Sequence, residues 1–197
     1  MRLRGKLHRV STAVHNPRMA LTDFHKNYFQ LFDLPLQFAV DLAQLGVRYR
    51  QLQGELHPDR YASAPDYEQR VAVQYSALVN EAYATLRKPL PRALYLLELA
   101  GMSQEEISNQ QIDGGFLIEQ MELREKLEAM DGLVDPDPVL EHLVKEISGD
   151  ITVHQGEFAQ AYAAQELPAA AGACVKMQYL EKLLREAEQI ESDLMDN

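Results

Sequence analysis

The sequence has little cysteine, no long hydrophobic run and a deficit of positive charge. Cys174 is the one cysteine among 197 residues, which excludes an internal disulfide and a metal site built from several thiolates. Its expected state is a buried and unreactive thiol. No apolar run approaches the roughly 20 residues that a membrane-spanning helix needs. Because acids outnumber bases by 30 to 19, the sequence favours protein partners with basic surfaces over a nucleic-acid backbone, which requires clustered cations.

The residues that are present are typical of a globular protein made of helices. Apolar residues make up 46% and charged residues 25% of the chain, which is the balance of a soluble protein. Apolar positions recur at helical spacing between proline and glycine residues, and no convincing strand alternation occurs. The predicted fold class is therefore all-α, and the length allows one domain or two small ones.

The first residues differ from the rest in charge. Residues 1–18 contain five basic residues and no acid, with apolar residues at helical spacing. One interpretation is an organelle transit peptide. The interpretation that we favour is a basic, disordered extension over residues 1–26. Equally, translation could begin at Met19, so that the residues before it come from an upstream start codon. A secretory signal is not expected, because no apolar core follows the basic start.

Two helices joined by a short polar segment are predicted in the first half of the chain. The first runs from about Leu42 to Leu56, and the second begins after Ser63 and ends before Pro89. Each carries one apolar stripe, so the two should pack as an antiparallel hairpin. Because a residue before proline disfavours helical geometry, His57 should be extended and Pro58 should end the first helix. The segment HPDRYASA then forms the tip of the hairpin, in water.

A second group of helices is predicted further along the chain. A short helix from Pro91 to Ala100 should end at Gly101 in a left-handed cap. Residues 102–113 are expected to link two domains, and they contain a capping box formed by Ser103 and Glu106. Three long helical patterns follow, over about residues 115–130, 138–165 and 169–194. Their short connections predict an antiparallel three-helix bundle.

The triplet His57, Pro58 and Asp59 permits several interpretations. A catalytic acid–base pair needs an orienting group and a pocket that excludes water, whereas this pair should lie on a solvated loop. One histidine and one aspartate also fall short of the three or four ligands of a metal site. We therefore expect no catalytic residue and no metal site. Helix termination and contact with a partner protein stay open.

The position of the triplet, between two amphipathic helices that form a hairpin, resembles the J-domain. J-domains are the modules by which co-chaperones engage ATPase chaperones of the DnaK/HscA class. An exposed carboxylate at such a tip is a good partner for an arginine of the chaperone, and nearby cations would steer the encounter. The resemblance implies that the chaperone-binding residues are His57, Pro58, Asp59, Arg48, Arg50 and Arg60.

Two residues ahead of the triplet depart from many J-domains. Gly54 and Glu55 stand where lysine or arginine is common in that family. Glycine inside a helix also destabilises it by about 1 kcal/mol relative to alanine. The departure bears on the strength of docking and not on its mode.

The rest of the chain resembles the HscB family, co-chaperones of iron–sulfur cluster assembly. A Gly/Phe-rich linker and cysteine-rich zinc modules, which follow the J-domain in DnaJ-type proteins, do not occur here. The segments that carry the resemblance are NYFQLFDLP (27–35), VNEAYATLRKPLPRALYLLEL (79–99), FLIEQMELREKLEAM (116–130) and MQYLEKLLREAEQIE (177–191). Together they cover nearly everything from Asn27 to the end.

The helix predicted over residues 115–130 has two apolar faces. At about 100° per residue, one stripe should face the bundle core, and it consists of Phe116, Leu123, Leu127 and Met130. A second apolar face rimmed by acids is typical of a protein-binding patch, and packing on another helix is an equal alternative from the residues alone. The HscB resemblance implies that this face binds the scaffold protein IscU, through Leu117, Ile118, Met121, Glu122, Glu125 and, on the last helix, Tyr179. One family glutamate position is Ala129 here.

The resemblance implies an L-shaped, non-catalytic adaptor. Its parts are a J-domain over residues 27–101, a link over 102–113 and a scaffold-binding three-helix bundle over 114–197. It would stimulate the ATPase of a DnaK/HscA-type chaperone, deliver IscU to it and promote cluster transfer, with no cofactor of its own. A J-domain adaptor that delivers another client is the alternative. We expect a monomer in the bacterial cytoplasm, or in the mitochondrial matrix if residues 1–18 are cleaved.

Overall fold

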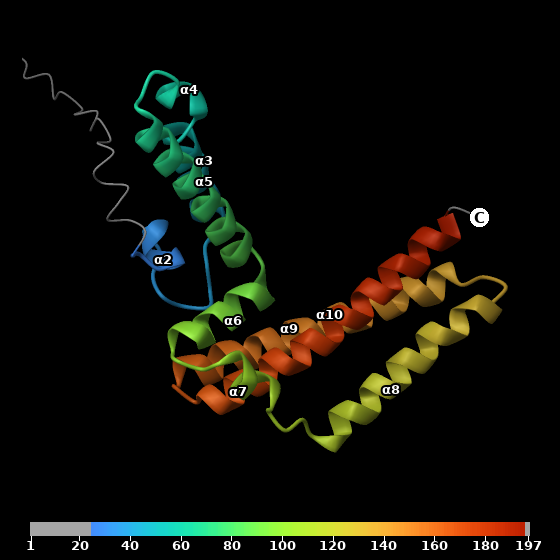
Figure 1. Cartoon of the computed structure of the whole chain (residues 1–197). Coiled ribbons are helices and arrows are strands. Elements are labelled where there is room, and N and C mark those ends of the chain that lie inside the picture. Colours follow the sequence, from blue (N-terminus) through green and yellow to red (C-terminus); the bar gives the residue numbers. More distant parts are fainter. Residues whose placement is uncertain (1–24, 196–197) are drawn as a thin grey trace, which may run out of the picture. The chain divides into compact units, whose positions relative to one another are not determined.

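The fold is described by a computed structural model that covers residues 25–195, without the side chains of Pro58, Asp59, Asp131 and Met195. All regular secondary structure in this part of the chain is helical, so the all-α prediction is confirmed (Figure 1). None of these helices is long and apolar enough to span a membrane. The interpretations of residues 1–18 fall outside the described residues.

The packing divides the chain into two compact units, which are described one at a time. Unit 1 contains the described residues up to Leu34 together with Ala43–Tyr83. Unit 2 contains Pro35–Leu42 and the chain from Ala84 onward. These units are defined by contacts within the structure. The domain limits expected from the sequence, for the J-domain, the link and the bundle, concern independent folding and stay predictions.

Unit 1 is built on an antiparallel helical hairpin. Helix α3 spans Leu42–Glu55, α5 spans Asp66–Arg87, and the short helix α4, Pro58–Tyr61, lies at the tip between them (Figure 1). A further short helix, α2, spans Tyr28–Leu31 and begins with a capping box from Asn27. The predicted hairpin is therefore present, with its polar connection at one end.

The apolar stripes of α3 and α5 meet in the interior of unit 1. Leu45 of α3 is 0% exposed and Tyr75 of α5 is 2% exposed, as the helical periodicity predicts. The ring of Tyr49 stacks on that of Tyr83, with centroids 3.9 Å apart. The Tyr49 hydroxyl also donates a hydrogen bond to Asn80 Oδ1 at 3.0 Å. These contacts hold α3 against α5.

The tip contains one element that the sequence did not predict. Pro58 was expected only to end a helix, but it also begins the single turn of α4. The turn is closed by a hydrogen bond from the Arg60 amide to the His57 carbonyl at 3.0 Å. Proline suits this first position, because its fixed φ is helical and no amide hydrogen is needed there. The triplet therefore starts a turn of helix.

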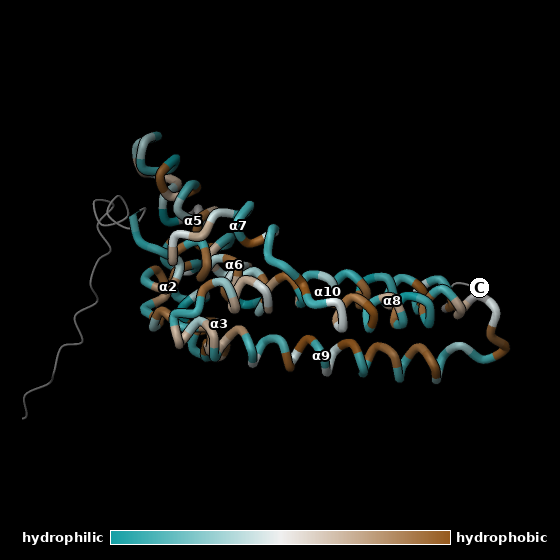
Figure 2. Tube along the Cα trace, turned by 90° about the horizontal axis from the view of Figure 1, so that it is seen from below, coloured by the Kyte–Doolittle hydropathy of each residue, from teal (hydrophilic) through white to brown (hydrophobic). Residues whose placement is uncertain are grey.

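Unit 2 consists mainly of long helices. Its elements are α6 (Pro89–Leu99), α7 (Gln104–Ser108), α8 (Gly114–Glu128), η1 (Ala129–Gly132), α9 (Asp137–Ala163) and α10 (Leu167–Met195). Helices α9 and α10 pack side by side in antiparallel fashion, and α8 contributes to the same core. Hydrophobic and hydrophilic residues are interspersed along α9 and α10, as expected for helices with one buried face (Figure 2).

The core of this bundle contains the stripe predicted on α8. Phe116, Leu123, Leu127 and Met130 are each 5% exposed or less. They join buried residues of α9 and α10, which include Leu140, Leu143, Ile147, Ile151, Leu180 and Leu183. The first apolar face of α8 is thus confirmed as the core face, which leaves its second face for the surface.

The segment expected to be a polar link is partly packed into unit 2. Its capping box is confirmed, since the Glu106 amide donates to Ser103 Oγ at 3.2 Å and the Ser103 amide donates to Glu106 Oε2 at 2.8 Å. The helix α7 that follows buries Ile107, which is 2% exposed. Gly101 has the predicted left-handed φ, of 92°. Cys174 is buried as predicted, and desolvation raises the pKa of its thiol to about 12, so the thiol stays protonated and unreactive.

Candidate functional site

The hairpin tip carries the triplet that the sequence singles out. His57 is exposed between α3 and α4, and Arg60 is exposed within α4. The side chains of Pro58 and Asp59 lie outside the described part of the structure. Their contribution, and that of the triplet as a whole, therefore stays a prediction.

Helix α3 carries the two other cations expected to contact a chaperone. Arg48 is held within unit 1, because its Nη2 lies 2.7 Å from Asp33 Oδ2 and its Nη1 donates to Gln51 Oε1 at 3.4 Å. Arg50 is exposed, and its Nη1 lies 3.4 Å from the position that a Cβ would take on Gly46. Of these two arginines, Arg48 would have to keep or exchange an acidic partner on docking, whereas Arg50 presents its charge to solvent.

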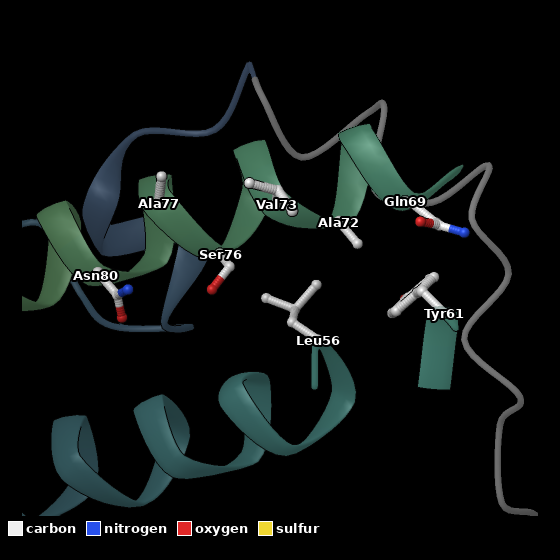
Figure 3. A pocket seen from close by; sticks show the side chains of 8 residues that line it. All are labelled: Leu56, Tyr61, Gln69, Ala72, Val73, Ser76, Ala77 and Asn80. Carbon is white, nitrogen blue, oxygen red and sulfur yellow. The ribbon is translucent and has the colours of Figure 1, made fainter. Parts of the chain in front are cut away.

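An apolar hollow of about 330 Å³ lies beside the tip. Leu56 points into it from the end of α3 and Tyr61 from α4, and Ala72 and Val73 of α5 form another wall (Figure 3). Val73 is a large apolar residue of α5 and is nevertheless 68% exposed. Apolar surface next to an exposed cation and histidine suits a protein-binding tip.

The second candidate surface lies on the outward face of α8. Leu117, Ile118 and Met121 are 43%, 59% and 63% exposed. Glu122 and Glu125 are exposed beside them. Within unit 2 this face is exposed and is not covered by another helix of the bundle, which answers that part of the alternative for the bundle helices. An exposed apolar face rimmed by acids remains, and it is the kind of surface that binds another protein.

A hollow of about 410 Å³ brings part of this face together with α10. Leu117 and Met121 line one side, and Tyr179 of α10, which is 47% exposed, lines the other. Leu183 of α10 also lines the hollow and is 3% exposed. Ile118, Glu122 and Glu125 do not line it and lie further round α8. The six residues predicted for scaffold binding thus form a hollow and an acidic flank.

The start of α8 and the aromatic wall of the hollow are fixed by one cluster. Asp113 caps α8 by accepting a hydrogen bond from the Phe116 amide at 2.8 Å, and it forms an ion pair with Lys176 Nζ at 3.0 Å. The amide hydrogen bond and the lysine hold the pKa of Asp113 below its usual value. The buried Phe116 ring meets Tyr179 edge to face, at 6.3 Å between centroids. Tyr179 is therefore positioned by the core.

Three further residues line the hollow that the sequence did not predict. They are Gln120, Arg124 and Lys182. Arg124 Nη2 lies 3.5 Å from Glu186 Oε1, an exposed pair that joins α8 to α10. The sequence pattern that indicated this surface consists of apolar residues with acids beside them. Gln120, Arg124 and Lys182 are polar and not acidic, so the pattern does not include them. The helical periodicity would have located Gln120, which lies between the buried and the outward faces of α8.

Both candidate surfaces are suited to binding and not to chemistry. Among the side chains that the structure describes, no three His, Cys, Asp or Glu residues come together in a group that could hold a metal ion. Two apolar hollows with charged surroundings, carried by helical units, are typical of a helical protein that binds other proteins. Comparison with known proteins supplies its family.

The relatives of this chain are HscB co-chaperones. Residues 112–188 match the family model described as HSCB C-terminal oligomerisation domain. The chain is 41% identical over 171 residues to the co-chaperone protein HscB homolog of Aeromonas hydrophila, and the match covers 87% of this chain and 99% of the relative. The solved structure of chaperone HscB from Vibrio cholerae matches with a TM-score of 0.78 and 39% identity, over 86% of this chain and 99% of that one. Human co-chaperone HscB gives a TM-score of 0.77 and 30% identity, with coverages of 85% and 83%.

The chain belongs to the HscB co-chaperone family, whose members have no catalytic activity of their own. The resemblance found in the sequence is thereby confirmed. The roles of individual residues at either surface are a separate matter and stay predictions.

Proposed function

We propose that this chain couples an IscU-type scaffold to a DnaK/HscA-type chaperone, whose ATPase it stimulates, and so promotes transfer of iron–sulfur clusters to acceptor proteins. The observation that carries the proposal is the combination, in a member of the HscB family, of a His-Pro-Asp hairpin tip with an exposed hollow between α8 and α10. Two binding surfaces on one chain raise the effective concentration of each partner near the other.

The proposed chaperone site is the tip of the α3–α5 hairpin. His57 and Arg60 are exposed there, and Arg50 adds a further exposed cation on α3. These charges support attraction of an acidic surface on the chaperone despite the net charge of −11 of the whole chain. Asp59 is the residue proposed to pair with a chaperone arginine.

The proposed scaffold site is the outward face of α8 with Tyr179. Leu117 and Met121 would bury their exposed apolar surface against the scaffold, which contributes roughly 25 cal/mol for each Å² removed from water. Glu122 and Glu125 would set the orientation through charge, because both are exposed on one flank of the hollow. The partner in this proposal is the IscU-type scaffold. Under the alternative, another client protein would bind this same surface.

The proposed place of action is the bacterial cytoplasm. Support comes from the relatives in Aeromonas hydrophila and Vibrio cholerae. The mitochondrial matrix is the alternative if residues 1–18 are removed as a transit peptide. Mass spectrometry of the native N-terminus distinguishes the two.

Calorimetric titration of an IscU scaffold into the full chain tests the proposal. The double variant Leu117→Ala/Met121→Ala should weaken scaffold binding by a factor of 10 or more, since about 1.4 kcal/mol corresponds to tenfold. The same variant should stimulate the chaperone ATPase as the wild type does when no scaffold is present. An unchanged scaffold affinity would contradict the proposed site.

A further inference from the structure

The hollow between α8 and α10 contains an unpaired polar atom. Gln120 Oε1 is shielded from solvent and accepts no hydrogen bond from any residue that the structure describes. The side chain is half-buried and lines the hollow with Leu117 and Met121. At about 100° per residue, Gln120 lies on α8 between the buried stripe that contains Leu123 and the outward face that contains Met121.

An unpaired acceptor at this position works against folding. Buried polar side-chain atoms almost always have a hydrogen-bond partner, and one without a partner destabilises the state in which it is buried. Methionine or leucine would fit the edge of the core without that penalty and is an equally good helix former. The folding of the free chain therefore gives no reason for an amide oxygen here, whereas a partner in the hollow would supply one.

The surroundings of Gln120 restrict the donor that it can accept from. Arg124 and Lys182 line the same hollow, so a lysine or arginine of a partner would meet two like charges there. Glu186 Oε1 lies 3.5 Å from Arg124 Nη2 and offsets part of the charge of Arg124. A neutral N–H group, such as a backbone amide, meets no such repulsion.

We propose that Gln120 is a specificity-determining acceptor of the scaffold site, and that the hollow takes an apolar side chain flanked by a neutral N–H donor. The apolar side chain lies in the hollow lined by Leu117, Met121, Tyr179 and the buried Leu183. On docking the Gln120 side chain turns toward the hollow, so that its Oε1, shielded in the free chain, accepts a hydrogen bond from the N–H group and is paired only in the complex. The inference rests on the proposed scaffold-binding function and adds a polar contact to a surface otherwise recognised by apolar side chains and acids.

The test compares Gln120→Met with the wild type in two measurements on the full chain. Methionine preserves length and helix propensity but removes the acceptor. Titration calorimetry with the IscU scaffold should show affinity weakened by about five- to tenfold, the loss of one hydrogen bond. Thermal unfolding of the free variant should occur about 2–4 °C higher, because the unpaired acceptor is gone. Gln160→Met, at an exposed position of α9 away from the hollow, is the matched control and should change neither value.

The combination of weaker binding and higher stability identifies a binding role, since a purely structural glutamine would lose stability on replacement. Unchanged scaffold affinity of Gln120→Met, alongside weakened binding of Leu117→Ala/Met121→Ala, would overturn the inference and leave the scaffold site standing. Unchanged affinity of both variants would overturn the inference and the scaffold site together. A lower unfolding temperature for Gln120→Met would also contradict it.

Discussion

The guanidinium of Arg48 lies 2.7 Å from a carboxylate oxygen of Asp33, so a cation expected to attract the chaperone is already paired within its own unit. Both side chains are partly open to solvent, with exposures of 42% and 66%. A pair this exposed contributes at most about 1 kcal/mol to stability. Its larger effect is on the electric field at the hairpin, where Asp33 offsets the charge of Arg48.

Asp33→Asn should therefore speed docking without harming the fold. Asp33 has a positive φ of 53°, a conformation that asparagine also tolerates, so the backbone need not change. We expect association with the chaperone to be roughly twofold faster at low salt, and the gain to vanish at about 1 M salt. Stopped-flow kinetics at the two salt concentrations measures this. Arg48→Gln should slow association, and an equal rate for all three proteins would refute the steering role.

Gly54→Ala should stabilise the hairpin. Gly54 lies in α3, its φ is not positive, and nothing lies within 4 Å of the position that a Cβ would occupy. Alanine should therefore raise the free energy of unfolding by up to about 1 kcal/mol and the unfolding temperature by about 1–3 °C. Gly101→Ala is the contrasting variant, because Gly101 has a φ of 92° and alanine is strained there. Calorimetry should show a rise for the first and a fall for the second; a fall for both would disprove the account of α3.

The Asp113 cap of α8 should make the stability of the fold depend on pH in the acid range. Folding lowers the pKa of Asp113 through the Phe116 amide and Lys176, so its stabilisation is complete above the ordinary value of 3.8 and is lost as the pH falls through the lowered folded value. Asp113→Asn keeps a capping oxygen but loses the charge. The variant should unfold at a lower temperature than the wild type at neutral pH, and the difference should close in acid below pH 3.8. A difference that does not change with pH would show that the carboxylate charge plays no part.

Periodicity predicted most of the architecture because burial repeats with the helix. The stripe that ends at Met130 is buried, and the capping box at Ser103 forms as its residue types indicate. The observed helix ends differ from the predicted ones by a few residues. Helix α6, for example, begins at Pro89 and not at Pro91, since the first turn of a helix tolerates both prolines. Ile107 is buried because α7 packs on α10, a contact that is far away in sequence.

The candidate sites were predictable only in part. Their apolar members stand out as a second face on one helix, so Leu117 and Met121 could be named from the sequence alone. The Arg48–Asp33 pair joins residues on different elements, and the unpaired oxygen of Gln120 depends on what surrounds it in three dimensions. Local spacing carries neither kind of information.

The central claim is that one chain links scaffold to chaperone, and chaperone ATPase activity in a mixing experiment tests it most directly. Asp59→Ala should lack the chaperone contact and Leu117→Ala/Met121→Ala the scaffold contact, so each variant keeps one site. With the IscU scaffold present, the wild type should stimulate the ATPase more than the separate effects of chain and scaffold combined. An equimolar mixture of the two variants, at concentrations where light scattering shows monomers, should fail to restore this synergy. Full synergy from the mixture would contradict the coupling of both sites through a single chain.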